Sequence, residues 1–140
     1  MTLFYLILPL SLLLFVLITF GLSAVEKFSD WKGQISFLQD HFKNTFLSGM
    51  VPLLLTIISV VELAAAILAI YGIFTLITDG NFEPGFYALT AATLSLLMLM
   101  FGQRMAKDYV GSANLTAYFM VCIFGLYIFG GELASNILLV

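Results

Sequence analysis

A single carboxylic acid, Glu62, stands near the middle of an apolar run that extends from Val51 to Ile77. An ionised carboxylate is costly in hydrocarbon, so an acidic residue in such a run is a functional hypothesis by default. Ser59 lies one helical turn before Glu62 on the same face, and the two residues form a candidate intramembrane polar site. Glu62 could carry a proton, or accept a hydrogen bond from a quinol or a similar hydroxyl. The structural alternative is a neutral acid bonded across a helix bundle, and the sequence favours neither interpretation.

A second set of polar residues gathers near the ends of apolar runs, where it could contact a partner or the head group of a ligand. Such a cluster is more often a salt-bridged rim whose long side chains reach the membrane surface. Since a helix rises about 1.5 Å per residue, Glu62 lies about 16 Å from the start of its run, beyond direct reach of Arg104 unless that helix end bends inward. The candidate rim residues are Lys27, Gln103, Arg104, Lys107 and Tyr109, with Glu26 and Asp108 beside them.

Other residue types argue against several classes of chemistry. His41 has no second His or Cys at ligand spacing, so the sequence predicts no metal or haem site. Cys122 is the single cysteine, which leaves no dithiol and no internal disulfide. No phosphate-binding glycine loop, nucleophile elbow or HExxH motif occurs. A net charge of -3 without a basic cluster argues against nucleic-acid binding. The sequence therefore favours a protein without catalytic activity of its own.

The elements that must position these residues are membrane-spanning helices. Hydrophobic residues make up 62% of the chain and charged residues only 9%, against about 25% charged residues in a typical soluble domain. Four apolar runs approach the length of about 20 residues that crosses the hydrocarbon core, and they lack the alternation of barrel strands. The sequence predicts an all-α integral membrane protein, a four-transmembrane-helix bundle forming one domain of residues 1–140. The expected spans are about 3–25, 51–77, 86–103 and 115–133.

The connection between the first two spans, residues 28–47, is predicted to hold a short interfacial amphipathic helix. Polar residues fall away from one apolar stripe, as expected for a helix that lies in the headgroup region with its aromatic side down. The less favoured alternative is a loop packed on the bundle. The stripe consists of Trp31, Ile35, Leu38, Phe42 and Phe46, and the polar side includes Gln39, Asp40 and Lys43.

Four stretches resemble, in the same order, the DoxX family of small four-span bacterial membrane proteins. They are Gly-Leu-Ser-Ala-Val-Glu-Lys-Phe (residues 21–28), the aromatic connector of residues 35–42, Val61-Glu62-Leu63, and Tyr71-Gly72-Ile73-Phe74-Thr75. The resemblance covers most of the chain and implies a bundle similar to that of vitamin K epoxide reductase. It also implies a bacterial inner-membrane location and a loose link to quinone-coupled or thiol redox systems, since some members resemble subunits of a thiosulfate:quinone oxidoreductase. Without a cysteine pair, however, this chain is excluded from internal thiol–disulfide exchange.

Two functional hypotheses follow. The favoured one is a non-catalytic accessory subunit of a membrane respiratory or redox complex, which packs against larger subunits and lipid because it has almost no mass outside the membrane. The alternative is a quinone-binding or quinone-coupled oxidoreductase membrane subunit. There Glu62 carries a proton, and the rim from Gln103 to Tyr109 orients the head group. Neither hypothesis requires a covalent or metal-bound cofactor, and the expected ligands are a quinone or a lipid.

The basic residues predict the orientation of the protein in a bacterial cytoplasmic membrane. All five Lys and Arg residues fall in the two connections on one side, which the positive-inside rule places in the cytoplasm, so both termini face outward. A cysteine introduced at Ser135, in a Cys122→Ser background, should therefore react with an impermeant thiol reagent in intact cells. Labelling that appears only after lysis would reverse the orientation.

Overall fold

The computed structural model describes residues 4–138, which are almost entirely helical. Four of the helices are long and apolar enough to cross a membrane, which confirms the all-α class and a multi-pass membrane protein. A fifth, shorter helix and a single 3₁₀ turn, η1 (Ser48–Met50), connect the first two spans. The α-helices are α1 (Phe4–Ser29), α2 (Trp31–His41), α3 (Val51–Asp79), α4 (Glu83–Met105) and α5 (Tyr109–Leu138).

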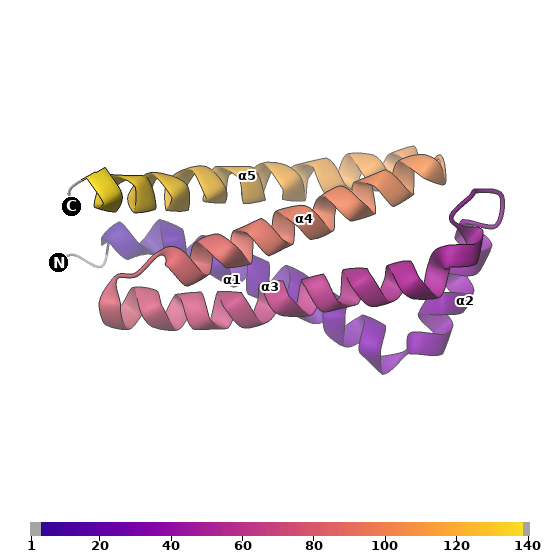
Figure 1. Cartoon of the computed structure of the whole chain (residues 1–140), viewed down its shortest axis with the longest axis horizontal. Coiled ribbons are helices and arrows are strands. Elements are labelled where there is room, and N and C mark those ends of the chain that lie inside the picture. The colour runs from indigo at the N-terminus through magenta and orange to yellow at the C-terminus, as the bar shows by residue number, and fades with distance from the viewer. Residues whose placement is uncertain (1–3, 139–140) are drawn as a thin grey trace.

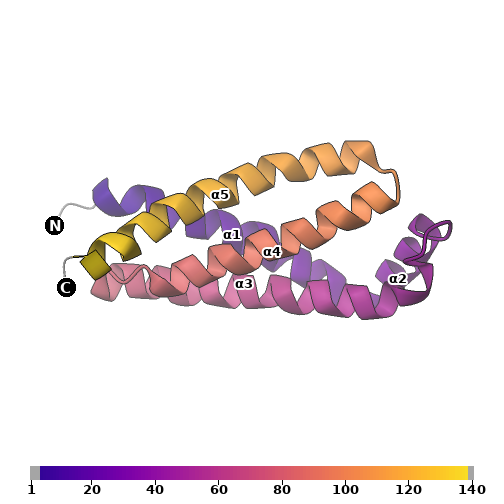
Figure 2. The same ribbon diagram turned by 45° about the horizontal axis from the view of Figure 1, so that its top comes forward.

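The four long helices form an elongated bundle (Figure 1). The start of α1 and the end of α5 lie at the end of the bundle where α3 turns into α4 (Figures 1 and 2). The opposite end carries α2 and the turn between α4 and α5. In the packing order, α3 lies against both α1 and α4, and α5 packs mainly on α4. Both termini of the described chain are therefore at one end, as an even number of spans requires.

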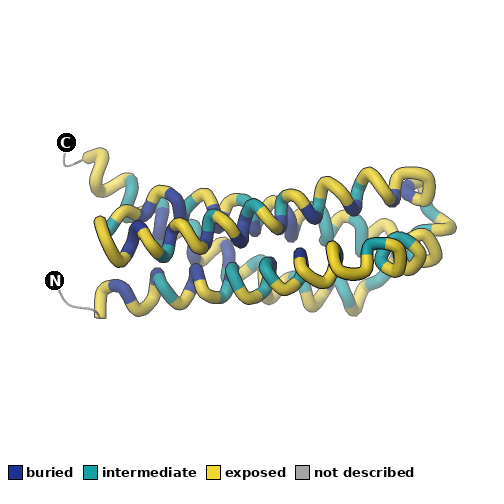
Figure 3. Tube along the Cα trace, turned by 90° about the horizontal axis from the view of Figure 1, so that it is seen from below, coloured by how far each residue is buried: buried dark blue, intermediate teal, exposed yellow. Residues whose placement is uncertain are grey.

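The interior of the bundle is narrow because small residues line it. Buried positions face between the helices, and exposed positions cover the outside (Figure 3). Ala65 and Ala69 of α3 are fully buried, as are Ala88 and Ala92 of α4, the helix that packs against α3. Small side chains let helix backbones approach closely. Large apolar side chains cover the outward faces, as suits helices surrounded by lipid tails. The bulky part of the core comes chiefly from Leu13, Val16, Phe20, Leu89 and Phe129.

The helices extend beyond the predicted spans because polar residues, which a hydropathy pattern leaves out, begin and end them. The Asp108 carboxylate accepts a hydrogen bond from the Gly111 amide at 2.9 Å and so caps the start of α5. At the other end of the bundle Gly80 adopts a left-handed conformation, with φ of 65°, and closes α3. Pro84 lies in the first turn of α4. The predicted start of the first span, Leu3, lies outside the described residues.

The predicted helix over residues 28–47 is shorter than expected. It begins after Asp30, whose side chain accepts a hydrogen bond from the Gly33 amide, and it ends at His41. The Thr45 hydroxyl then donates to the Phe42 carbonyl oxygen and accepts from the Leu47 amide, and these local bonds favour a turn over a helix. Phe46 therefore does not continue the apolar stripe and is 66% exposed. The location of α2 in the headgroup region stays a prediction.

The crossing of α3 and α4 at Gly72 and Gly85 provides a test of the packing. A Cβ atom on Gly72 would lie 2.8 Å from the Gly85 Cα atom, so Gly72→Ala must push the two backbones apart. We expect a loss of about 1–3 kcal/mol in unfolding free energy, measured by titration with denaturing detergent. Gly131→Ala in α5 is the control, because no described atom lies within 4 Å of its added Cβ. Equal behaviour of the two variants would contradict the close crossing.

Candidate functional site

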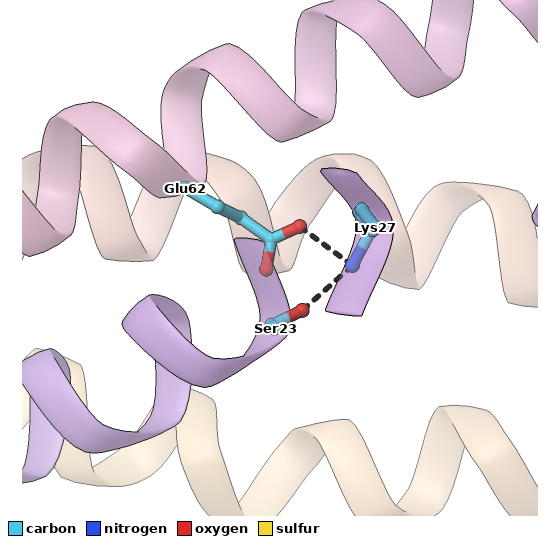
Figure 4. A network of polar contacts seen from close by, with 3 residues as sticks. All are labelled: Ser23, Lys27 and Glu62. Carbon is cyan, nitrogen blue, oxygen red and sulfur yellow. Dashed lines mark hydrogen bonds and ion pairs between the residues drawn. The ribbon is translucent and has the colours of Figure 1, made fainter. Parts of the chain in front are cut away.

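The buried Glu62 carboxylate of α3 meets the Lys27 ammonium group in the last turns of α1 (Figure 4). Lys27 Nζ lies 2.9 Å from Glu62 Oε1, which is ion-pair distance although the approach is not aligned as a hydrogen bond. The side chains are only 1% exposed for Glu62 and 15% exposed for Lys27. Glu62 therefore faces the inside of the bundle, as its position in the sequence predicted, and a cation compensates its charge.

Ser23 completes this polar cluster. Lys27 Nζ donates a hydrogen bond to Ser23 Oγ at 2.6 Å, and the spacing of four residues places both side chains on one face of α1. The contact reaches Glu62 only because α1 continues through Lys27, past the predicted end of the span at residue 25. The sequence grouped Lys27 with the rim, but the long lysine side chain turns inward instead. The four-residue spacing of Ser23 and Lys27 was the one feature of the sequence that could have indicated this contact.

Two further hydroxyl groups inside the bundle are buried without partners among the described residues. Ser59, one turn before Glu62, is fully buried, as is Ser95 of α4. Neither hydroxyl has a hydrogen-bond partner within residues 4–138, and the same holds for the Gln103 Oε1 atom. Buried polar atoms are normally satisfied by protein or by ordered water. The interior of the bundle therefore has hydrogen-bonding capacity that the described residues do not use.

A cavity of about 540 Å³ lies at the α2 end of the bundle, with Lys27 in its wall. Sites for small molecules typically measure roughly 300–1,000 Å³ and combine an apolar lining with a few polar groups. Most of this wall is apolar and comes from α2, α3 and α4, including Leu38, Leu55, Ile58 and Phe101. The polar contributors are Lys27, Gln34, His41, Gln103 and Asp108. The arrangement suits an apolar molecule with a polar head group.

His41 and Asp108 connect α2 to the turn between α4 and α5 at this cavity. His41 Nε2 lies 3.8 Å from Asp108 Oδ2, and both side chains are partly exposed. The imidazole ring also stacks on Phe37 and meets the edge of Phe42. Sequence analysis found no ligand partner for His41 and missed this pairing, because Asp108 is distant in the chain.

The predicted rim separates into two groups. Gln103 joins Lys27 in the cavity wall. Arg104, Lys107 and Tyr109 are exposed and do not line that cavity. The Arg104 guanidinium group instead lies over the Tyr109 ring, 5.2 Å from its centroid, in a cation–π contact. Gln103 and Arg104 are neighbours in the last turn of α4, but successive residues of a helix point to different sides, so only Gln103 lines the cavity.

Comparison with known proteins adds no relative to this description. No family model matches the chain, and no curated protein or solved structure matches it significantly. Within residues 4–138 no three His, Cys, Asp or Glu side chains come together as a metal site. Fold and site together define a class: a multi-pass α-helical membrane protein with a buried ion pair beside a mainly apolar cavity. The resemblance to the DoxX family stays a prediction.

The Lys27–Glu62 ion pair predicts the outcome of a double-mutant cycle. Lys27→Met leaves the buried Glu62 carboxylate unpaired, and Glu62→Leu leaves the ammonium group unpaired, so each should lose about 3–5 kcal/mol of unfolding free energy. The double variant should regain most of this loss, because apolar pairs of similar volume often replace buried ion pairs at little cost.

Titration with denaturing detergent measures the unfolding free energy of the unaltered protein, the two single variants and the double variant. Asp40→Ala serves as the control, since its pairing with Lys43 at 3.5 Å is on the surface and contributes little. Additive losses in the double variant would show that Lys27 and Glu62 do not interact.

Proposed function

We propose that this protein binds a lipid-soluble molecule of the quinone class in the cavity beside Lys27, as a membrane component of a redox system. The observation that carries the proposal is the position of Lys27, which belongs both to the cavity wall and to the buried pair with Glu62. A quinone combines an apolar ring and tail with oxygen atoms that form hydrogen bonds. The cavity combines a mainly apolar wall with a few polar groups.

Hydrogen-bonding capacity supports this ligand class. An ammonium group has three N–H donors, and in Lys27 one of them donates to Ser23 Oγ, while Glu62 Oε1 lies at ion-pair distance without a hydrogen bond. The other N–H groups can donate to a ligand oxygen. The Gln103 side-chain amide offers both a donor and an acceptor, and its oxygen has no partner within the described chain. A quinol hydroxyl held between these two residues would accept a hydrogen bond from the Lys27 ammonium group and donate one to the Gln103 oxygen.

Glu62 has an indirect role in this proposal. It pairs with Lys27 but does not line the cavity, so a proton released from a bound quinol would reach Glu62 by way of Lys27. Proton transfer of this kind needs groups within hydrogen-bond distance of one another. Ser23, Lys27 and Glu62 meet that requirement as a connected set.

An accessory role in a larger respiratory complex of a bacterial inner membrane is the second candidate. The observation that favours it is α5, the least buried of the four spanning helices. The outward face of α5 exposes Met120, Phe124 and Tyr127, and the exposed Tyr127 has a hydroxyl that lipid tails cannot satisfy. Large subunits that copurify after gentle detergent extraction would support this role, which is compatible with quinone binding.

Filling the cavity tests the proposed function. Ile58 lines the cavity from α3, so Ile58→Trp should abolish binding of decylubiquinone, a short-chain quinone analogue, measured by native mass spectrometry. Val60→Trp is the matched control, because Val60 is 56% exposed on the same helix and does not line the cavity. Equal binding by both variants and the unaltered protein would place the ligand elsewhere, and no binding by any of them would exclude the proposal.

A further inference from the structure

We infer that the cavity selects electrically neutral amphiphiles over anionic ones, and that Glu62 determines this selectivity by compensating the charge of Lys27. The inference rests on the proposed function in so far as that function makes the cavity a ligand site. It adds to that function the net charge of the preferred ligand and the residue that determines this preference.

The lysine ammonium group and the imidazole in the cavity wall each lie beside a carboxylate. Lys27, His41 and Asp108 are the titratable residues that line the cavity. Lys27 lies 2.9 Å from the Glu62 carboxylate, and His41 lies 3.8 Å from the Asp108 carboxylate. Within residues 4–138 the wall therefore presents no cation that lacks an anion. A ligand carboxylate or phosphate would have to compete with Glu62 or Asp108 for its counterion.

The apolar lining makes that competition unfavourable. A charge moved from water into a poorly polar site loses its hydration, and only a well-placed opposite charge compensates the loss. Glu62, only 1% exposed and not part of the cavity lining, already pairs with the Lys27 ammonium group. A bound anion would also lie near the Asp108 carboxylate, which repels it. A neutral head group with hydrogen-bonding oxygens avoids both costs.

Glu62 is therefore a positioning residue that acts on the ligand through Lys27. Removal of its charge should leave an ammonium group in the cavity wall without a buried counterion. Because electrostatic interactions are strong where water is scarce, the cavity should then attract anions. The selectivity of the cavity should reverse with a single change outside its lining.

The experiment compares two ligands that differ only in the head group. Myristyl alcohol is neutral, and myristate is anionic in slightly alkaline buffer. Each is measured by its displacement of decylubiquinone from the purified full-length protein, with native mass spectrometry as the readout. The alcohol should displace the quinone analogue at a concentration at least about tenfold lower than myristate does. Displacement by myristate at an equal or lower concentration would overturn the inference and leave the proposed function standing. A protein that binds no quinone analogue would instead overturn the proposed function.

Variants then test the role of Glu62. Glu62→Gln should improve displacement by myristate relative to the alcohol by at least about tenfold, and Lys27→Gln/Glu62→Gln should lose that gain because no cation remains. Asp108→Asn is the graded control: it keeps the cap on α5, and its partly exposed position predicts a smaller gain. A folded Glu62→Gln protein with an unchanged ratio would overturn the role of Glu62. Should Glu62→Gln fail to fold, the double variant decides, since a strong preference for myristate there would also overturn it.

Discussion

The Lys27–Glu62 ion pair is the constraint on which the arrangement of this bundle depends. A carboxylate at the middle of a spanning helix has no water to solvate it, so the protein must supply a cation or keep the acid neutral. Lys27 supplies that cation from α1, at 2.9 Å. The pairing requires α1 to continue as a helix past its apolar run and to lie against α3. The ion pair therefore fixes how the first and third helices meet.

Close packing at one end of the bundle contrasts with the open space at the other. Gly72 and Gly85 bring α3 and α4 so close that an added Cβ would collide with backbone. Nearer the start of α3, Leu54, Leu55 and Ile58 border the cavity instead. Small residues permit helix contact and larger ones leave irregular gaps. The ion pair joins α1 to α3, and Lys27 also forms part of the cavity wall.

The short helix α2 gives the cavity its third wall. Its aromatic and amide side chains face the space between α3 and α4, and the His41–Asp108 pair connects it to the turn before α5. Residues from helices α1 to α4, from the connection after α2 and from the turn before α5 thus surround one volume. The site takes its chemical character from lining side chains that each lie beside a carboxylate, since Lys27 pairs with Glu62 behind the lining and His41 with Asp108. That character agrees with a neutral, lipid-soluble ligand more readily than with an ionic one.

The sequence by itself determined the spanning helices, because hydropathy and length are local properties that survive without any partner. It also determined that Glu62 must be buried in protein, since hydrocarbon offers a carboxylate nothing to bond with. Tertiary structure alone decided which residue compensates Glu62, because Lys27 is distant from it in the chain and a long lysine side chain can turn toward water or inward. It likewise separated Gln103 from Arg104. The end of α2 before Phe46 has a local cause, the hydrogen bonds of Thr45, which the apolar periodicity does not register. Periodicity records which residues share a face, whereas the neighbours of that face depend on how the helices cross.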